Sequence, residues 1–259
     1  MELKTVLTIA GSDTSAGAGI QQDLKTVTSL GHYAVTVPTA LTAQNTVGVQ
    51  KVMTVPEDML QAQLDSIFSD IKVDAIKIGM IPCTQSARII VENVSRHHVP
   101  VVCDPVMVST SGTQLMSDEC IEYIKKELFP LCTLVTPNIP EAQRLTGITG
   151  EYQPEEVGKT LVSAFGCAFP MKGGHGEGSI MRDVLMTTDG QTHEYCSPRI
   201  ATSNLHGTGC TLSSAIATLL ATGLSLPEAV GGAKQVIDKG IMNGRSLHIG
   251  HGNGPLWLF

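Results

Sequence analysis

The part of the chain best suited to chemistry is residues 204–210, Asn-Leu-His-Gly-Thr-Gly-Cys, directly followed by an apolar helical pattern. Gly207 and Gly209 flank the small polar Thr208, and glycine reaches backbone angles that a side chain forbids. The segment can therefore turn tightly and point consecutive N–H groups at one place. The helix expected over 211–222 begins with unpaired N–H groups and the positive end of its dipole. The pattern predicts an anion-binding turn that includes its cysteine. A plain loop before a core helix is the alternative, unless a second site converges on this turn.

Composition excludes several classes of protein. The 259 residues are 42% hydrophobic and 16% charged, which describes a globular protein with an ample core. The net charge of −7 argues against nucleic-acid binding, because that function needs a basic face. No apolar run approaches the ~20 residues of a membrane span, and residues 1–10 are too short in apolar length for a signal peptide. We therefore expect no nucleic-acid partner and no membrane partner.

The cysteines give no sign of a disulfide framework or a zinc site. Seven of them are scattered without a C-x-x-C pair, at positions 83, 103, 120, 132, 167, 196 and 210. We therefore expect a reduced, cytoplasmic compartment. The sequence contains no repeat or long linker, so we also expect one domain over residues 1–259.

Strand patterns alternate with helix patterns along the chain. Strands are predicted over 5–10, 33–38, 74–79, 99–104, 131–136 and 167–171. Helices are predicted over 18–30, from Pro56, over 84–97, after Pro137 through Leu145, and over 154–164, 211–222 and 227–242. Residues 181–187 and 191–196, joined by Asp-Gly, have the signature of a β-hairpin. The alternation implies a parallel sheet built from right-handed βαβ units.

Apolar spacing also predicts which helix residues face inward. In the first helix these are Ile20, Leu24, Val27 and Leu30, and in the helix after Pro56 they are Met59, Leu60, Leu64 and Ile67. The small and polar residues 39–45 are expected to form a loop that faces a ligand.

Polar clusters follow the carboxyl ends of the predicted strands, where ligands bind in open parallel sheets. They lie at 11–13, 43–45, 79–80, 104–105, 137–138 and 172–174. This convergence is the second site that the anion-binding interpretation requires.

Seven segments carry a resemblance to a known family. They stand in order at 10–26, 42–46, 77–80, 104–107, 136–141, 171–175 and 206–213, with a closing segment at 250–255. Together they resemble the hydroxymethylpyrimidine/phosphomethylpyrimidine kinases of thiamine synthesis, a branch of the ribokinase superfamily. The resemblance implies an α/β, ribokinase-like fold, in which a central, mostly parallel sheet lies between helices in three layers. It also implies a homodimer, and ATP-dependent phosphorylation of 4-amino-5-hydroxymethyl-2-methylpyrimidine and then of its monophosphate.

Phosphoryl transfer depends mostly on positioning and charge stabilisation, so the site should offer N–H groups, a cation and a metal. The resemblance implies an anion hole formed by Gly207, Thr208, Gly209 and Cys210. It implies ATP contacts from Lys172, Asn138, Gly207 and Gly209, and Mg²⁺ held directly or through water by Asp104 and Glu141. A surface lysine at 172 and an ordinary helix-start acid at 141 are the alternatives.

Cys210 stands where most ribokinase relatives carry an aspartate that deprotonates the substrate hydroxyl. A thiol at a helix N-terminus can have a lowered pKa, so a thiolate base is chemically feasible. The alternative is that Cys210 packs against the substrate while the metal and the anion hole do the work. The sequence leaves both interpretations open.

Gln44 and Asp23 are the expected readers of the pyrimidine. An aminopyrimidine presents an NH₂ donor beside a ring-nitrogen acceptor, and an amide complements both. Asp23 has an alternative role as an ordinary acid of an amphipathic helix. The remaining walls of the substrate site are expected to come from Gly11, Ala18, Met80, Val106 and Met107.

Residues 107–116 resemble a lid that closes over the reacting centre. Dual pyridoxal/pyrimidine kinases carry a cysteine in this lid, and this chain has Ser109 and Thr110 there, which favours the pyrimidine substrate. A pyridoxal or pyridoxine kinase is the alternative enzyme, and a vitamer-binding protein without catalysis is a third hypothesis. The chain departs from the family pattern at Ala16 and Leu205. A dinucleotide-binding enzyme is excluded, because no G-x-G-x-x-G opens the first helix.

Overall fold

The central sheet contains β1 (Thr5–Asp13), β2 (Tyr33–Asn45), β3 (Gly48–Thr54), β4 (Ala75–Ile78), β5 (Val101–Cys103) and β6 (Leu134–Val135). The computed structural model describes residues 2–109, 112–148, 153–173 and 179–259. The order across the sheet is β3-β2-β1-β4-β5-β6. Strands β2, β1, β4, β5 and β6 pair in parallel, and β3 pairs antiparallel with β2 at the edge. The predicted, mostly parallel sheet is therefore confirmed.

A second sheet extends the first. It is antiparallel, in the order β7-β8-β9, and comprises β7 (Phe169–Met171), β8 (Ile180–Met186) and β9 (Thr192–Pro198). The hairpin predicted around Asp-Gly is confirmed by the β8–β9 pairing, which runs from Met186 opposite Thr192 to Ile180 opposite Pro198. A single parallel bridge between Leu134 and Ala168 connects the two sheets.

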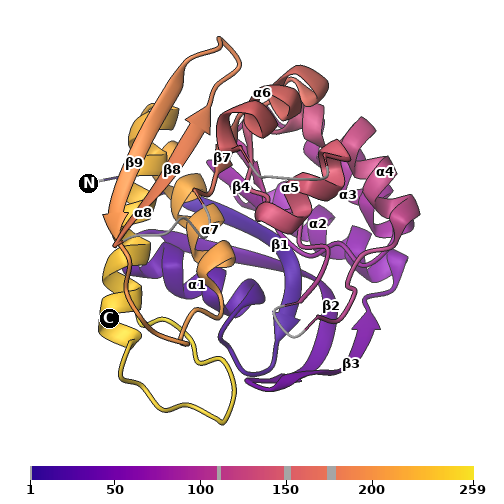
Figure 1. Cartoon of the computed structure of the whole chain (residues 1–259). Coiled ribbons are helices and arrows are strands. Elements are labelled where there is room, and N and C mark those ends of the chain that lie inside the picture. Colours follow the sequence, from indigo (N-terminus) through magenta and orange to yellow (C-terminus); the bar gives the residue numbers. More distant parts are fainter. Residues whose placement is uncertain (1, 110–111, 149–152, 174–178) are drawn as a thin grey trace.

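Helices cover both faces of the central sheet (Figure 1). They are α1 (Gly19–Ser29), α2 (Glu57–Asp70), α3 (Thr84–Val94), α4 (Asp118–Glu127), α5 (Ile139–Thr146), α6 (Pro154–Phe165), α7 (Thr208–Ala221) and α8 (Leu226–Gly244), with a short 3₁₀ helix at Phe129–Leu131. Among the residues the structure describes, no helix is long and apolar enough to cross a bilayer.

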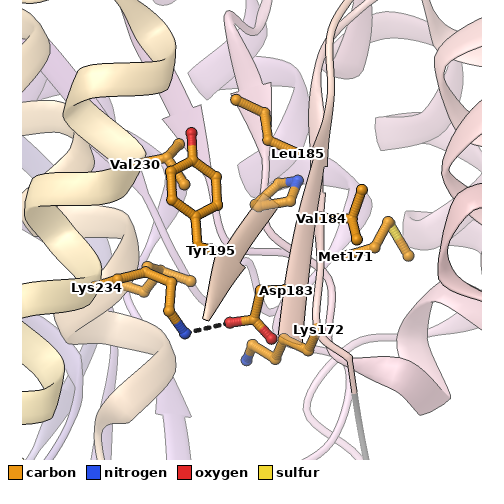
Figure 2. Close-up of a pocket in the computed structure, with 10 residues that line it drawn as sticks. Met171, Lys172, Asp183, Val184, Leu185, Tyr195, Val230 and Lys234 are labelled. Carbon is orange, nitrogen blue, oxygen red and sulfur yellow. Dashed lines mark hydrogen bonds and ion pairs between the residues drawn. The ribbon is translucent and has the colours of Figure 1, made fainter. Parts of the chain in front are cut away.

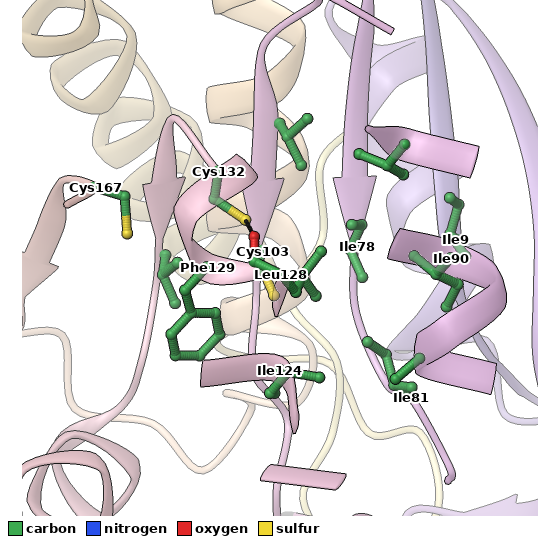
Figure 3. Packing of buried hydrophobic residues seen from close by; sticks show 14 of the residues in the cluster. Ile9, Ile78, Ile81, Ile90, Cys103, Ile124, Leu128, Phe129, Cys132 and Cys167 are labelled. Carbon is green, nitrogen blue, oxygen red and sulfur yellow. Dashed lines mark hydrogen bonds between the residues drawn. The ribbon is translucent and has the colours of Figure 1, made fainter. Parts of the chain in front are cut away.

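Successive residues of the central strands pack into two separate cores, because side chains alternate across a strand. In β1, Ile9 belongs to the core beneath α2, α3 and α4, where it lies near Ile78 and Ile90 (Figure 3). Val6 of the same strand packs on the other face with residues of α7 and α8, including Ile216 and Val230. The two cores pack the sheet between two layers of helices. This packing fixes the carboxyl ends of the parallel strands in one row.

The inward face predicted for α1 is wrong at Leu24, which is 45% exposed. The helix instead buries Gln22, Asp23, Thr26 and Val27. The amide of Gln22 donates to the Thr211 hydroxyl of α7 at 3.0 Å, so polar partners set the inward face. The same kind of error occurs in α2, where Met59 is 54% exposed while Leu60 and Leu64 are fully buried.

The loop expected over 39–45 is wrong, because these residues belong to a strand. Strand β2 continues through Asn45, because β3 supplies an antiparallel partner from Ala40 opposite Thr54 to Asn45 opposite Gly48. A register shift between Ala43 and Gln44 interrupts this pairing. The end of β2 is therefore a strand that presents Gln44 at an irregularity. Neither β3 nor α4 was predicted.

Candidate active site

The start of α7 forms the floor of the site. Gly207 is its N-terminal cap and has a φ of 86°, in the left-handed region. A Cβ at this position would lie 1.9 Å from the carbonyl oxygen of Gly17, so glycine is required both by the backbone and by the space. The N–H groups of Gly209 and Cys210 belong to the first turn, which offers them no acceptor within the helix. The predicted turn therefore presents N–H groups beyond the ends of the strands.

Asp104 lies beside this helix start, directly after β5. A Cβ at Gly209 would lie 3.1 Å from Oδ2 of Asp104, which shows how closely the carboxylate approaches α7. The Thr136 hydroxyl donates to Oδ1 at 3.4 Å. Burial raises the pKa of Asp104, against the opposing effect of the Lys77 and Lys172 charges.

Glu141 closes a capping box at the start of α5. Its Oε2 accepts from the N–H of Asn138 at 2.9 Å, and the side chain of Asn138 accepts from the N–H of Glu141 at 2.9 Å. The N–H of Met107 donates to Oε1 at 3.2 Å. Burial and then the negative charge of Asp104 raise the pKa of Glu141 to about 7. Glu141 is thus a helix-start acid, and it also lies within electrostatic range of Asp104.

The two carboxylates have donor chemistry that fits Mg²⁺. They repel one another in a buried setting, and a divalent cation would relieve that repulsion. Mg²⁺ binds one or two carboxylates and completes its shell with phosphates and waters. No group of three or more His, Cys, Asp or Glu side chains that could hold a metal occurs in the described ranges. The pair suits a metal shared with a phosphate better than a metal caged by protein alone.

Lys172 follows β7 and lines a cavity between the second sheet and α8 (Figure 2). The lining residues are Pro170, Met171, Lys172, Asp183, Val184, Leu185, Tyr195, Leu212, Val230 and Lys234. Asp183 is held by Lys234 of α8 and by the N–H of Gly173, the latter at 2.9 Å. The Lys172 charge opposes the rise in pKa that burial causes at Asp104 and Glu141. This cation therefore lies within electrostatic range of the acidic pair.

A second cavity opens at the other end of the site, where Gln44 lies. It is lined by Gln44, Asn45, Thr46, Val47, Gly48, Ser109, His206 and Asn253. Ser109 belongs to the segment 107–116 that was predicted as a lid, of which residues 110–111 lie outside the described ranges. Asn253 comes from the closing segment 250–255 and donates its N–H to the carbonyl oxygen of Thr46 at 3.1 Å. Three distant parts of the chain therefore surround the amide of Gln44.

Some of the residues predicted to line the substrate site lie in contact with one another. A Cβ at Gly11 would lie 2.9 Å from Sδ of Met80, so these two residues touch. Ala18 is half-buried and donates its N–H to Asp13 at 2.9 Å, and Val106 is half-buried. Met107 is wrong as a wall, because its side chain is fully enclosed in the core beneath α3 and α4.

The prediction that Asp23 reads the pyrimidine is also wrong. Its carboxylate is fully buried, and Lys77 donates to Oδ1 at 2.9 Å and to Oδ2 at 2.8 Å. Thr8 donates to Oδ2 at 2.5 Å, and Ser214 donates to Oδ1 at 2.6 Å. Every one of these partners is a buried residue of the protein itself, so the carboxylate of Asp23 is not available to a substrate. A lysine inside a buried strand requires a carboxylate partner, and Lys77 was the signal that could have assigned Asp23 correctly.

Sequence reasoning missed two residues next to Gln44. Nε2 of His206 lies 2.9 Å from Oδ2 of Asp13 and 3.4 Å from the amide nitrogen of Gln44. Burial would raise the pKa of Asp13, but hydrogen bonds from His206 and Ser15 outweigh it and lower that pKa. Both residues lie in segments that carry the family resemblance. As a carboxylate and an imidazole, they could have been identified from the sequence as candidates for the site.

The surroundings of Cys210 favour the neutral thiol over the thiolate. Burial raises its pKa to about 12, although Lys77 acts in the opposite direction. The interpretation in which Cys210 packs against the substrate is therefore favoured over a thiolate base.

Known proteins match this chain over nearly its whole length. A family model described as phosphomethylpyrimidine kinase matches residues 13–257. A hydroxymethylpyrimidine/phosphomethylpyrimidine kinase of Salmonella typhimurium is 44% identical, with 100% of this chain and 98% of that protein covered. The corresponding Escherichia coli protein is 42% identical over the same shares.

Solved structures agree. A phosphomethylpyrimidine kinase from Clostridium difficile superposes with a TM-score of 0.80 at 40% identity, covering 92% of this chain and 99% of that chain. A pyridoxal kinase from Bacillus subtilis superposes with a TM-score of 0.89 at 32% identity, covering 99% and 98%. The fold is ribokinase-like, as the resemblance implied. The chain belongs to the phosphomethylpyrimidine kinase family.

Proposed function

We propose that this protein is an ATP-dependent kinase that phosphorylates 4-amino-5-hydroxymethyl-2-methylpyrimidine and then converts the monophosphate to the pyrophosphate, for thiamine synthesis. The observation that carries the proposal is the amide of Gln44 in a cavity that also contains His206, the residue before the N-terminal cap of α7. An amide can accept from the amino group of the pyrimidine and donate to its ring nitrogen. The N–H groups at the start of α7 suit an anion.

ATP is expected at the other end of the site. Lys172 would neutralise a phosphate, the turn of Gly207 and Gly209 would donate N–H groups to it, and Asn138 would contact the nucleotide. Asp104 and Glu141 would hold Mg²⁺, which would screen phosphate charge when bound. In support, a Staphylococcus aureus pyridoxal kinase of similar fold, with a TM-score of 0.87, was solved in complex with AMP-PCP.

A homodimer in the cytoplasm is part of the proposal, as is a single domain over 1–259. Val52 and Met53 of edge strand β3 are exposed apolar residues, which suits burial against a second copy. All seven cysteines are free thiols, which suits a reduced compartment.

Pyridoxal phosphorylation is the competing activity, because several solved proteins of similar fold are pyridoxal kinases. An assay of ADP release with Mg-ATP separates the two when hydroxymethylpyrimidine, its monophosphate and pyridoxal are offered in turn. We expect turnover of both pyrimidines and poor turnover of pyridoxal. Efficient turnover of pyridoxal alone would contradict the proposed substrate while leaving the family intact.

A further inference from the structure

His206 connects the start of α7 to the amide that faces the substrate cavity. Its side chain is 9% exposed, and that of its partner Asp13 is 3% exposed. Nε2 of His206 lies 2.9 Å from Asp13 Oδ2 and 3.4 Å from Gln44 Nε2. One ring nitrogen thus faces a carboxylate and an amide at once, and it can carry only one proton.

Asp13 determines where that proton is. Its Oδ1 accepts from the N–H of Ser15 at 2.8 Å and from the Ser15 hydroxyl at 2.7 Å, and its Oδ2 accepts from the N–H of Ala18 at 2.9 Å. These donors keep the carboxylate ionised, in line with its lowered pKa. An ionised carboxylate only accepts, so Nε2 of His206 carries the proton and donates to Asp13.

A protonated Nε2 cannot accept from the amide nitrogen of Gln44, so two donors face each other at 3.4 Å. At the other end of the amide, Oε1 lies 3.2 Å from the Thr42 hydroxyl, which is also 2.9 Å from the carbonyl oxygen of Ser12. That carbonyl can only accept, so the Thr42 hydrogen points to it and the Thr42 oxygen is left as an acceptor. Half a turn of the amide removes both mismatches. Oε1 then shares the N–H of His206 with Asp13 as a second, longer acceptor, and the amide nitrogen donates to the Thr42 oxygen.

We infer that His206, held by Asp13, is a positioning residue that fixes the Gln44 amide with its oxygen toward His206 when the pyrimidine binds. The inference rests on the proposed function and deepens it, because it assigns the orientation of the substrate ring. The amide edge that remains for the substrate has a lone pair on the His206 side and an N–H on the Thr42 side.

This orientation decides where the reacting group lies. The 4-amino group donates to Oε1 on the His206 side, and the adjacent ring nitrogen accepts from the amide N–H. The hydroxymethyl group is attached to the ring carbon on the far side of the amino group from that nitrogen, so it extends further in the His206 direction. His206 immediately precedes Gly207, the N-terminal cap of α7. The opposite amide orientation would turn the hydroxyl away from this helix start.

The inference is tested by comparing kcat/KM for the 4-amino substrate with kcat/KM for its 4-oxo analogue, which presents an acceptor in place of the donor. His206→Met removes the ring N–H while keeping a side chain of similar length, and His206→Gln restores an N–H donor. We expect His206→Met to reduce the preference for the amino form roughly tenfold, the value of one hydrogen bond, and His206→Gln to retain most of it. Because the readout is a ratio, general losses of activity cancel. His98→Met, at an exposed histidine, is the matched control and should keep the wild-type ratio.

A double-mutant cycle isolates the contact between the two side chains. Gln44→Glu replaces the amide with a group that only accepts and has no orientation to fix. In that background His206→Met should leave the amino-to-oxo ratio unchanged.

A folded His206→Met variant with the wild-type ratio would overturn the inference, as would an equal effect of His206→Met in the Gln44→Glu background. If His206→Met does not fold, His206→Asn, whose shorter side chain withdraws the donor, gives the same readout, and an unchanged ratio there would overturn the inference too. A wild-type protein that turns over neither pyrimidine would overturn the proposed function, and the inference with it.

Discussion

The ionisable side chains around the start of α7 are charged or neutral according to their burial and their neighbours. Burial raises the pKa of Cys210 to about 12 and, with the charge of Asp104, that of Glu141 to about 7. Hydrogen bonds lower the pKa of Asp13 despite its burial. The surroundings therefore favour a neutral thiol, an anion beside His206, and an acidic pair whose donor atoms suit a cation.

The raised pKa of Cys210 has a measurable consequence. Because only the thiolate reacts with iodoacetamide, labelling of Cys210 in the free protein should still be rising at about pH 9, without a plateau. Peptide mass spectrometry follows this labelling, with the exposed Cys196 as the control in the same digest.

Cys210→Ala should lower kcat less than about tenfold, whereas loss of a general base costs about 10²–10⁴-fold. A plateau near neutral pH, or a loss in that larger range, would support the thiolate base.

Lys172 should act on ATP and not on the pyrimidine. Lys172→Ala should lower kcat by about 10²–10³-fold, comparable to removal of an electrostatic donor from other active sites. Calorimetric titration should show unchanged affinity for hydroxymethylpyrimidine. Lys126→Ala, at a lysine that is 83% exposed, is the control. Loss of pyrimidine binding in a folded Lys172→Ala variant would contradict the assigned role.

The positions of some candidate residues were predictable, because these residues come at or after the ends of predicted strands. Gln44, Asp104 and Lys172 follow or end predicted strands, and each lies in the site or lines its cavities. Asp23 was not predictable in the same way, because a helix carboxylate serves a ligand or a buried lysine equally well. The distinction depends on which residue of β4 lies across from it.

Four elements meet at one buried ion pair. Asp23 of α1 accepts from Lys77 of β4, from Thr8 of β1 and from Ser214 of α7. Burial acts to lower the pKa of Lys77, but the negative groups around it, Asp23 foremost, together outweigh burial and hold that pKa above its usual range. The stabilisation is present below the pKa of lysine in the unfolded chain and is lost only as the pH rises through the higher folded value. The pair therefore persists throughout the neutral range.

Breaking this pair should be costly. Asp23→Asn removes the carboxylate that is hydrogen-bonded to the buried Lys77 charge and should reduce the free energy of unfolding by about 3–5 kcal/mol. The double variant Asp23→Leu with Lys77→Met removes both charges and should be less destabilised than Asp23→Asn. Urea denaturation measures both, with the exposed Asp70→Asn as the control. A wild-type midpoint for Asp23→Asn would show that the ion pair contributes little.

Element prediction succeeded where a single pattern dominated. The β8–β9 hairpin and the helix after residue 207 follow from an Asp-Gly turn and from glycines before an apolar run. The extension of β2 depends on pairing with β3, whose exposed residues carry no alternation of burial. Although β3 follows β2 directly, it has no alternating pattern that marks it as a strand, so the end of β2 was predicted as a loop.

At the scale of the whole molecule, the strand ends and the helix starts beside them hold most of the candidate residues, with Asp23 and Met107 as the exceptions. The two cavities lie toward opposite ends of this row of strand ends. The parallel order was predictable because alternating strand and helix patterns admit few other architectures. The antiparallel edge at β3 was not, and it leaves exposed apolar residues such as Val52 and Met53.

If this edge joins two copies, a charge there should separate them. Met53→Lys should convert a dimer to a monomer, because burial of an unpaired lysine in an interface is unfavourable. Light scattering after size exclusion measures the mass, and Leu224→Lys, at another exposed leucine, should leave it unchanged. A wild-type mass for Met53→Lys would place the interface elsewhere.

The central claim is that one chain performs two successive phosphorylations of a pyrimidine. Phosphorus NMR of a reaction with hydroxymethylpyrimidine and excess Mg-ATP tests it most directly. We predict that the signal of the monophosphate appears first and is then replaced by the pair of coupled doublets of a pyrophosphate ester. A product that stops at the monophosphate would contradict the second step, and absence of any new phosphate ester would contradict the account as a whole.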